Sequence, residues 1–483
     1  MKCRVTIDTK IVIGILDKRC YGQFIEHLGK CIYGGIWVGE NSNIPNEKGF
    51  RLDVLQAVKD LNPQLIRWPG GNFASGYHWI DGVGPRDQRP RLYDMAWGVE
   101  EPNYFGTDEF IEFCRLVGAE PFIVVNAGNG TPEEAAHWVE YCNSTRETYY
   151  SSLRRRYGHE KPYGVKLWGI GNELWGEWQI GFCKDGAECA RRTVEFANEM
   201  RKVDPNIELV AVGCEDPEWN IEMIKGAGKY FDYLSVHFYD FDNKPYRELV
   251  AVPIDVERRL IDIYDLVQVV RRKYGIKREI KIAFDEWNVW YPDAKEPLLT
   301  QVTSVKDAIF TAGILNMLQR LCNIVPISNF AQTVNVLPLI IATEDGRMVL
   351  TPQYLVFKMY GKNRGENVVR TLVDGEFYKS NSVGEYVPYV DVSATVSEDG
   401  RVLHVYALNR NENDGIELRI VFKGFQPRSY SHLFLSGESE EDKNTLENEN
   451  KVKIEEEKAI KLADDEAIVY LRPHSINVLN FYD

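Results

Sequence analysis

Eight short apolar runs alternate with amphipathic, helix-like stretches along most of the chain, and this alternation limits the fold more than any other feature. Repeated strand–helix units predict a parallel sheet with helices packed against it, and eight such units favour closure into a (β/α)8 TIM barrel, an α/β fold. The stretches between the runs include Phe50 to Lys59, Thr107 to Val117, Gly186 to Val203 and Ile254 to Tyr274. The runs are Tyr21 to Glu26, Leu65 to Pro69, Pro121 to Asn126, Val165 to Gly169, Glu208 to Gly213, Tyr233 to His237, Lys281 to Glu286 and Ile324 to Asn329.

The residue pattern changes after about residue 365, where valine, threonine and tyrosine alternate with polar residues and turn signals recur. This pattern is typical of an antiparallel β-sandwich, here expected to be jelly-roll-like. The opening residues alternate like a strand that we expect to join the sandwich. The predicted organisation is a strand at 1–15, a barrel at 16–364 and a sandwich at 365–483.

Two local features refine this division. Thr351 is a favourable N-cap and Pro352 a favourable first residue for the last helix of the barrel, which we expect to carry an apolar stripe from Tyr354 to Tyr360. Gly437 to Asn450 is acidic and rich in asparagine, and charge runs of this kind predict a solvated loop.

Charge and cysteine content exclude several classes of function. The chain has 483 residues, with 57 basic and 72 acidic ones and a formal net charge of −15. This balance argues against nucleic acid or an anionic membrane as the main partner. The opening segment has no long apolar stretch typical of a signal peptide, and no run of about 18 apolar residues predicts a membrane span. Nine scattered cysteines without a C-x-x-C pair predict no structural zinc and a reducing, cytoplasmic location.

Two carboxylates follow predicted strands of the barrel. Glu173 comes just after the fourth apolar run, and Glu286 closes the seventh. The reacting groups of such barrels lie at the carboxyl ends of the strands, so these side chains are expected to face one cleft. A pair of carboxylates across one cleft is what glycoside hydrolysis needs, with one protonated acid and one ionised partner.

The surroundings suggest which carboxylate has which role. Glu173 is flanked by Trp168, Trp175 and Trp178, whose apolar rings could desolvate it and raise its pKa. Glu286 needs a positive neighbour to stay ionised, and Arg67, which lies in the second run, is the candidate. Other predicted strand ends also carry polar side chains, which packing alone does not explain: Glu26, Asn72, His237, Tyr239 and Gln332.

Six segments resemble the intracellular α-L-arabinofuranosidases of glycoside hydrolase family 51, in family order and at family-like spacing. The Gly-Asn-Glu triplet is shared by a whole clan of barrels, but its combination with Glu-His-Leu-Gly and Arg-Trp-Pro-Gly-Gly-Asn is specific. The resemblance covers nearly the whole barrel and, more loosely, the sandwich. The segments are Tyr21 to Gly29, Arg67 to Asn72, Gly169 to Glu173, Ser235 to Tyr239, Asp285 to Tyr291 and Ala331 to Asn335.

The resemblance implies a role for each matching position. Glu173 would be the acid/base and Glu286 the nucleophile of a retaining enzyme that releases terminal arabinofuranose, with no metal and no organic cofactor. Arg67 would hold the nucleophile, while His27 and His237 would orient their neighbours. Trp97 and Trp290 would line the site near the leaving group, although core filling is an alternative for both. The remaining positions would hydrogen-bond the furanose hydroxyls: Glu26, Asn72, Asn172, Tyr239 and Gln332.

Partners and alternatives complete these expectations. The resemblance implies arabinofuranose-containing oligosaccharides as substrates and a homo-oligomer, often a hexamer. A clan relative acting on xylosides or β-glucans stays open, because the same two glutamates would serve it. A non-catalytic carbohydrate-binding barrel is a second alternative, although Glu173 and Glu286 argue against it. A Schiff-base lyase is a third, although the predicted strand ends offer no lysine.

Overall fold

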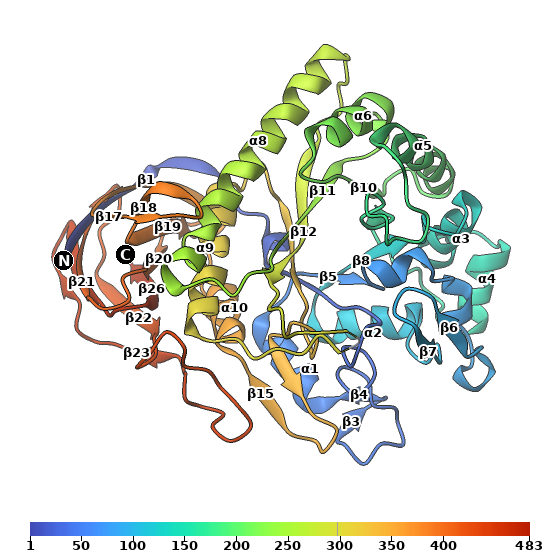
Figure 1. Ribbon diagram of the computed structural model, residues 1–483, viewed down its shortest axis with the longest axis horizontal. Coiled ribbons are helices and arrows are strands. Elements are labelled where there is room, and N and C mark those ends of the chain that lie inside the picture. The colour runs from blue at the N-terminus through green and yellow to red at the C-terminus, as the bar shows by residue number, and fades with distance from the viewer. Residues whose placement is uncertain (297) are drawn as a thin grey trace.

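The computed structural model describes residues 1–296 and 298–483 of the chain. Eight parallel strands close into a barrel in chain order, so the predicted fold class is confirmed (Figure 1). The predicted apolar runs coincide with these strands to within a few residues at their ends. The strands are β2 (Gly22–Phe24), β5 (Leu65–Trp68), β8 (Glu120–Val125), β9 (Leu167–Ile170), β10 (Glu208–Val212), β11 (Tyr233–Asp240), β12 (Lys281–Val289) and β13 (Ile327–Ala331).

A helical layer surrounds the barrel. Two helices, α2 and α5, span the residues predicted from sequence, and the last helix, α10, begins at Pro352 with Thr351 as its N-cap. The Thr351 hydroxyl accepts a hydrogen bond from the backbone N–H of Tyr354. The helices are α1 (Leu52–Leu61), α2 (Thr107–Val117), α3 (Pro132–Asn143), α4 (Tyr149–Arg156), α5 (Gly186–Val203), α6 (Pro217–Ala227), α7 (Tyr246–Leu249), α8 (Val252–Lys273), α9 (Val305–Arg320) and α10 (Pro352–Lys362).

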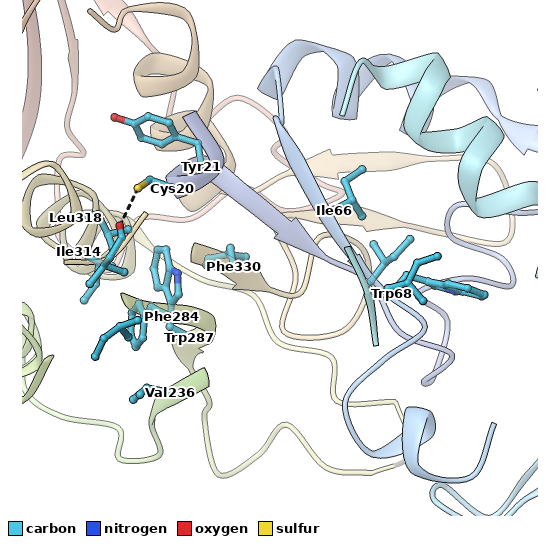
Figure 2. Packing of buried hydrophobic residues seen from close by; sticks show 14 of the residues in the cluster. Cys20, Tyr21, Ile66, Trp68, Val236, Phe284, Trp287, Ile314, Leu318 and Phe330 are labelled. Atoms are coloured by element: carbon cyan, nitrogen blue, oxygen red, sulfur yellow. Dashed lines mark hydrogen bonds between the residues drawn. The ribbon is translucent and has the colours of Figure 1, made fainter. Parts of the chain in front are cut away.

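Alternation along the strands divides the core into two layers. A small inner cluster fills the barrel with residues such as Leu65, Phe122 and Leu167. The larger outer cluster lies between strands and helices, and Figure 2 shows Phe284 of β12 near Ile314 of α9 within it.

The C-terminal part forms a ten-stranded sheet that curls beside the barrel (Figure 1). The opening strand β1 (Lys2–Ile15) pairs with β16 (Asn367–Asp374) and β21 (Ile416–Lys423), so the expectation that it joins this sheet is confirmed. The β1–β21 ladder is parallel, which makes the sheet mixed rather than purely antiparallel. The predicted division after residue 364 falls between the end of α10 and the start of β16.

The remaining strands of this sheet follow one another through hairpins and longer loops. Its order is β23-β22-β26-β20-β19-β16-β1-β21-β25-β24, around a separate apolar cluster. These strands are β19 (Val390–Val396), β20 (Val402–Asn409), β22 (Ser429–Leu435), β23 (Glu455–Glu456), β24 (Lys461–Leu462), β25 (Glu466–Leu471) and β26 (Ser475–Tyr482).

The acidic loop at 437–450 was expected to be solvated, and this is wrong for part of it. Its backbone carbonyls at Glu440 and Asp442 accept hydrogen bonds from the N–H groups of Lys306 and Val305, at the start of α9. Asn444 is buried within the same loop. The first N–H groups of a helix lack intrahelical partners, so a loop that supplies carbonyls there docks instead of staying in water.

Two expectations concern features of the whole chain. All nine cysteines are free thiols, and all except Cys214 are buried. Among the described residues, no helix is both long enough and apolar enough to cross a membrane.

Candidate active site

The two glutamates singled out from the sequence face one pocket of about 720 Å³. Glu286 lies within β12, and Glu173 follows β9 in a turn where Gly171 and Glu173 have φ angles of 77° and 43°. This left-handed backbone turns the chain sharply after the strand. One carboxylate oxygen of each glutamate and a ring nitrogen of His237 all lie within 4.8 Å of one another.

Both oxygens of Glu286 accept hydrogen bonds from the floor of the pocket. The Arg67 guanidinium donates to Oε1 at 2.6 Å, and the Tyr239 hydroxyl donates to Oε2 at 2.7 Å. Arg67 also donates to Asn172 at 2.7 Å, and its pKa is raised because Asp285 and Glu286 outweigh the cost of its burial. These bonds hold both oxygens of the Glu286 carboxylate in a fixed orientation.

His237 lies between the two glutamates. Its Nδ1 is 2.8 Å from Glu173 Oε1 and 3.6 Å from Glu286 Oε2, and its Nε2 is 3.3 Å from Asp285 Oδ1. The Ser235 hydroxyl donates to the same Asp285 oxygen at 2.6 Å. Burial alone would lower the pKa of His237, but the surrounding carboxylates, led by Glu286, raise it to about 10. His237 therefore carries a proton at neutral pH.

Glu26 occupies the opposite wall of the pocket. The backbone N–H of Phe73 and the indole N–H of Trp97 donate to its Oε1, at 3.1 and 3.2 Å, and Gln332 donates to its Oε2 at 2.9 Å. Burial and the nearby charge of Glu286 nevertheless raise the pKa of Glu26 to about 7. The backbone at Gly70 packs closely against Glu26, because a Cβ atom on Gly70 would lie 2.5 Å from Glu26 Cγ.

Most of the residues predicted from the sequence line this pocket. The exceptions are Arg67, which is buried beneath Glu286, and His27, whose side chain lies behind Glu26 against Phe73. Trp290 packs against Tyr239 at the rim and donates to the carbonyl of Ala294. The predicted residues that line the pocket are Glu26, Asn72, Trp97, Asn172, Glu173, His237, Tyr239, Glu286, Trp290 and Gln332.

The expected surroundings of Glu173 are only partly correct. Trp175 and Trp178 line the pocket, in edge contact with each other at 5.3 Å between ring centroids. Trp168 does not line it, because its side chain points into the outer core, where it packs on Trp138 and donates to the Val165 carbonyl. Alternation along β9 places Trp168 on the helix-facing side.

Several residues of the site were not identified from the sequence, among them Ser235, Asp285 and Gln179. Ser235 could have been found, because it lies two residues before His237 on β11 and shares its face. Asp285 could not, since adjacent residues of a regular strand face opposite sides. The register of β12 against β11 shifts between Ala283 and Glu286, and this irregularity brings Asp285 and Glu286 to the same cluster. The third is Gln179, a loop residue that donates to Asn72.

The cluster of Glu173, His237 and Glu286 also has the residue types of a metal site. It is the single such group found in the described part of the chain. Its oxygens and nitrogens already bond one another, Arg67 and Tyr239, which explains their approach without a cation. The absence of a metal and of an organic cofactor stays a prediction.

Known proteins resemble this chain along nearly its whole length. A family model described as "Alpha-L-arabinofuranosidase 1 domain" matches residues 57–252, and one described as "Alpha-L-arabinofuranosidase C-terminal domain" matches residues 285–475. The chain is 38% identical over 431 residues to "Alpha-L-arabinofuranosidase C" of Emericella nidulans, covering 84% of this chain and 85% of the relative. It is 36% identical over 446 residues to "Intracellular exo-alpha-(1->5)-L-arabinofuranosidase 1" of Bacillus subtilis, covering 88% of each.

Solved structures agree. An α-L-arabinofuranosidase of Thermotoga maritima, in an arabinose complex, superposes with a TM-score of 0.93 at 42% identity over the full length of both chains. The family 51 enzyme of Thermotoga petrophila gives 0.93 at 43% identity, covering 99% of this chain and 100% of that one. A family 44 xyloglucanase of Paenibacillus polymyxa shares the fold alone, with a TM-score of 0.65 at 13% identity.

A closed parallel barrel that presents two carboxylates across one pocket, one after its fourth strand and one within its seventh, defines the chain as a barrel-type glycoside hydrolase. Within that class the similarities extend over barrel and sheet alike. The chain belongs to the α-L-arabinofuranosidases of glycoside hydrolase family 51.

Proposed function

We propose that this protein is a retaining, exo-acting α-L-arabinofuranosidase that releases terminal α-L-arabinofuranosyl residues from arabino-oligosaccharides. The observation that carries the mechanism is the approach of Glu173 and Glu286, whose nearest carboxylate oxygens lie within 4.8 Å. Retaining enzymes hold their carboxyl groups about 5–5.5 Å apart, whereas inverting ones need about 6.5–9.5 Å to admit a water molecule. The short approach therefore favours double displacement.

In the first step, Glu286 is the nucleophile. One of its oxygens attacks the anomeric carbon while Glu173 gives its proton to the glycosidic oxygen. The bond from the anomeric carbon to that oxygen breaks, and an arabinosyl ester of Glu286 forms. Arg67 and Tyr239 hold the two Glu286 oxygens, so the attacking group is oriented before substrate arrives.

In the second step, Glu173 is the base. Its carboxylate takes a proton from water as the water oxygen attacks the anomeric carbon, and the ester bond to Glu286 breaks. Two inversions at one carbon leave its configuration unchanged. His237 bonds the Glu173 carboxylate at 2.8 Å, which keeps that group aimed at the reacting oxygen in both steps.

The wall around Glu26 suits the hydroxyls of a furanose ring. Glu26, Asn72, Asn172 and Gln332 are proposed to bind them, because they line the pocket with polar atoms. The Oε1 atom of Gln332 is buried and accepts no hydrogen bond from the described residues, so a sugar hydroxyl is a natural donor to it. Tyr239, expected to bind the sugar, is instead proposed to act mainly on Glu286.

The aromatic rim is proposed to contact the leaving group. Trp97 and Trp290 line the pocket, and indole faces stack on the C–H faces of sugars. Relatives from Bacillus subtilis and Acetivibrio thermocellus are named intracellular exo-α-(1→5)-L-arabinofuranosidases. We accordingly propose that this chain acts inside the cell, as a homo-oligomer, on short arabino-oligosaccharides.

Two variants test the assignment on 4-nitrophenyl α-L-arabinofuranoside and on arabinobiose. Glu286→Ala is expected to lower kcat on both by about 10³-fold or more, because no other group replaces the nucleophile. Glu173→Ala is expected to spare formation of the arabinosyl-enzyme from the nitrophenyl substrate, whose leaving group needs no proton, and azide should then restore turnover with retained configuration. Glu177→Ala, an exposed glutamate of the same loop, is the control.

Other results would contradict the proposal. If Glu173→Ala lowered the turnover of both substrates equally, Glu173 would not be the acid/base. Inverted product in the first seconds of wild-type turnover, followed by NMR, would exclude double displacement. Faster hydrolysis of a nitrophenyl xyloside or β-glucoside than of the arabinoside would assign the pocket to another sugar.

A further inference from the structure

The hairpin that carries Trp97 has little packing of its own. Its strands are β6 (Leu92–Asp94) and β7 (Val99–Glu101). Tyr93 on β6 and Met95 in the turn are exposed by 69% and 67%. Yet the indole N–H of Trp97 reaches Glu26 in the pocket. Something other than apolar burial must therefore hold this hairpin in place.

Glu101, at the end of β7, is the buried anchor of the hairpin. Only 6% of the residue is exposed, and three hydrogen-bonding groups converge on its carboxylate. The Tyr33 hydroxyl donates to Oε1 at 2.5 Å, the backbone N–H of Asn103 donates to Oε1 at 2.7 Å, and His27 Nδ1 lies 3.0 Å from Oε2. A carboxylate anion can accept all three of these hydrogen bonds at once.

The His27 ring connects this anchor to the sugar pocket. Its Nε2 lies 3.0 Å from the indole N–H of Trp68, which can only donate, so Nε2 must accept and the proton must reside on Nδ1. Nδ1 consequently donates to Glu101. The same ring stacks on Phe73 at 4.5 Å, and the Phe73 backbone N–H donates to Glu26.

We propose that Glu101 is a positioning residue for the substrate. Through His27 it sets the position of Glu26 from behind, and through its own hairpin it sets the position of Trp97 above that carboxylate. It thereby controls the affinity of the pocket for the terminal sugar without touching that sugar. The proposal rests on the proposed function only in assigning Glu26 and Trp97 to substrate contact.

Glu101→Gln is the direct test. The replacement keeps the size of the side chain but exchanges one carboxylate oxygen for an N–H₂ group. Both Glu101 oxygens accept hydrogen bonds, so in either orientation the new N–H₂ group faces another donor. His27 cannot resolve the conflict by moving its proton to Nε2, because the Trp68 N–H occupies that side. Glu100→Gln is the matched control, since Glu100 is adjacent on the same strand and its side chain is 71% exposed.

The measurements are kcat, KM and the dissociation constant of arabinose, taken well below the unfolding midpoint of each variant. Glu101→Gln is expected to raise KM and the dissociation constant about tenfold and to change kcat less than about threefold, because Glu173 and Glu286 are not displaced. Tyr33→Phe removes one donor with less risk to folding and should give a smaller change in the same direction. Glu100→Gln should match the wild type.

A double variant separates positioning from general damage. If Glu101 acts through Trp97 and Glu26, Glu101→Gln combined with Trp97→Phe should raise KM clearly less than the product of the single effects. Multiplicative effects, or a lowered unfolding midpoint with an unchanged KM, would overturn the proposal. The comparison uses whichever nitrophenyl glycoside the wild type cleaves, so an error in the proposed sugar specificity would show separately.

Discussion

At the residue scale, the carboxylates of the pocket have different hydrogen-bond donors. Glu286 receives a guanidinium and a phenol, whereas Glu26 receives two uncharged donors on Oε1 and an amide on Oε2. Burial and the charge of Glu286 outweigh these donors and the nearby Arg67, which explains why the pKa of Glu26 rises to about 7. Glu26, which is proposed to face the sugar, thus has a pKa close to neutral pH.

This shift predicts a pH-dependent stability. A folded pKa of about 7 exceeds the ordinary value of 4.5, so the folded protein binds this proton more tightly than the unfolded chain does. The stabilisation is fully present below pH 4.5 and is lost as the pH rises through 7. Glu26→Gln, which cannot ionise, should lose less stability than the wild type between pH 5 and pH 8, by up to about 3 kcal/mol.

Urea unfolding of both proteins at the two pH values measures this difference. Glu366→Gln, a carboxylate distant from the pocket, should behave as the wild type. An identical pH dependence for Glu26→Gln and the wild type would mean that Glu26 keeps an ordinary pKa. Activity is a second readout, because we expect Glu26→Gln to lower kcat/KM at least tenfold if it binds the sugar.

At the element scale, local signals decide where helices begin. Thr351 and Pro352 predicted the start of α10, and the structure confirms it. The Thr351 hydroxyl makes two hydrogen bonds. It accepts one from the Tyr354 N–H and donates one to the Leu339 carbonyl at 3.0 Å. Both partners are buried, so neither could turn to water if the hydroxyl were removed.

Thr351→Ala is therefore expected to destabilise the protein by about 1–2 kcal/mol, at the upper end of the range for N-caps. Thr351→Ser, which retains the hydroxyl, should recover most of the loss. Chemical unfolding of the three proteins provides the measurement. Equal destabilisation by both substitutions would assign the effect to the lost methyl group rather than to the cap.

At the scale of the whole molecule, buried charges join the barrel to the sheet. Asp391 on β19 accepts from Arg320 of α9 at 2.8 Å and from Arg410 of the sheet at 2.9 Å. Burial would raise the pKa of Asp391, but Arg320 and Arg410 lower it below its ordinary value. Its ionised form therefore stabilises the fold above pH 3.8, and this contribution disappears as the pH falls through the lowered pKa.

Asp391→Asn should lower the free energy of unfolding by about 3–5 kcal/mol at pH 7, because Arg410 loses its buried counter-charge and Arg320 keeps Glu257 alone. The deficit relative to the wild type should shrink in strongly acidic solution, where Asp391 itself is protonated. Calorimetry at pH 7 and at a series of pH values descending below 3.8 checks both statements. Asp414→Asn, an exposed residue in the loop between β20 and β21, should leave the transition unchanged, and a similar effect of the two substitutions would refute this account.

The sequence by itself determined the elements and their order. Hydrophobic periodicity and helix caps are local properties, so eight strand–helix units, the limits of α2 and α5 and the start of α10 could be predicted without knowledge of tertiary contacts. Strand ends also identified Glu173 and Glu286, because closure of the barrel brings all carboxyl ends to one mouth.

Only the tertiary structure decided which side chains meet. The irregular pairing of β11 with β12 brings Asp285 to His237, the docking of the acidic loop caps α9, and a hairpin anchored by Glu101 delivers Trp97 to Glu26. None of these leaves a periodic signal, since each depends on the spatial position of a residue distant in the chain. Periodicity reports which face of an element is buried, whereas hydrogen-bond partners depend on the registers and loop paths that folding selects.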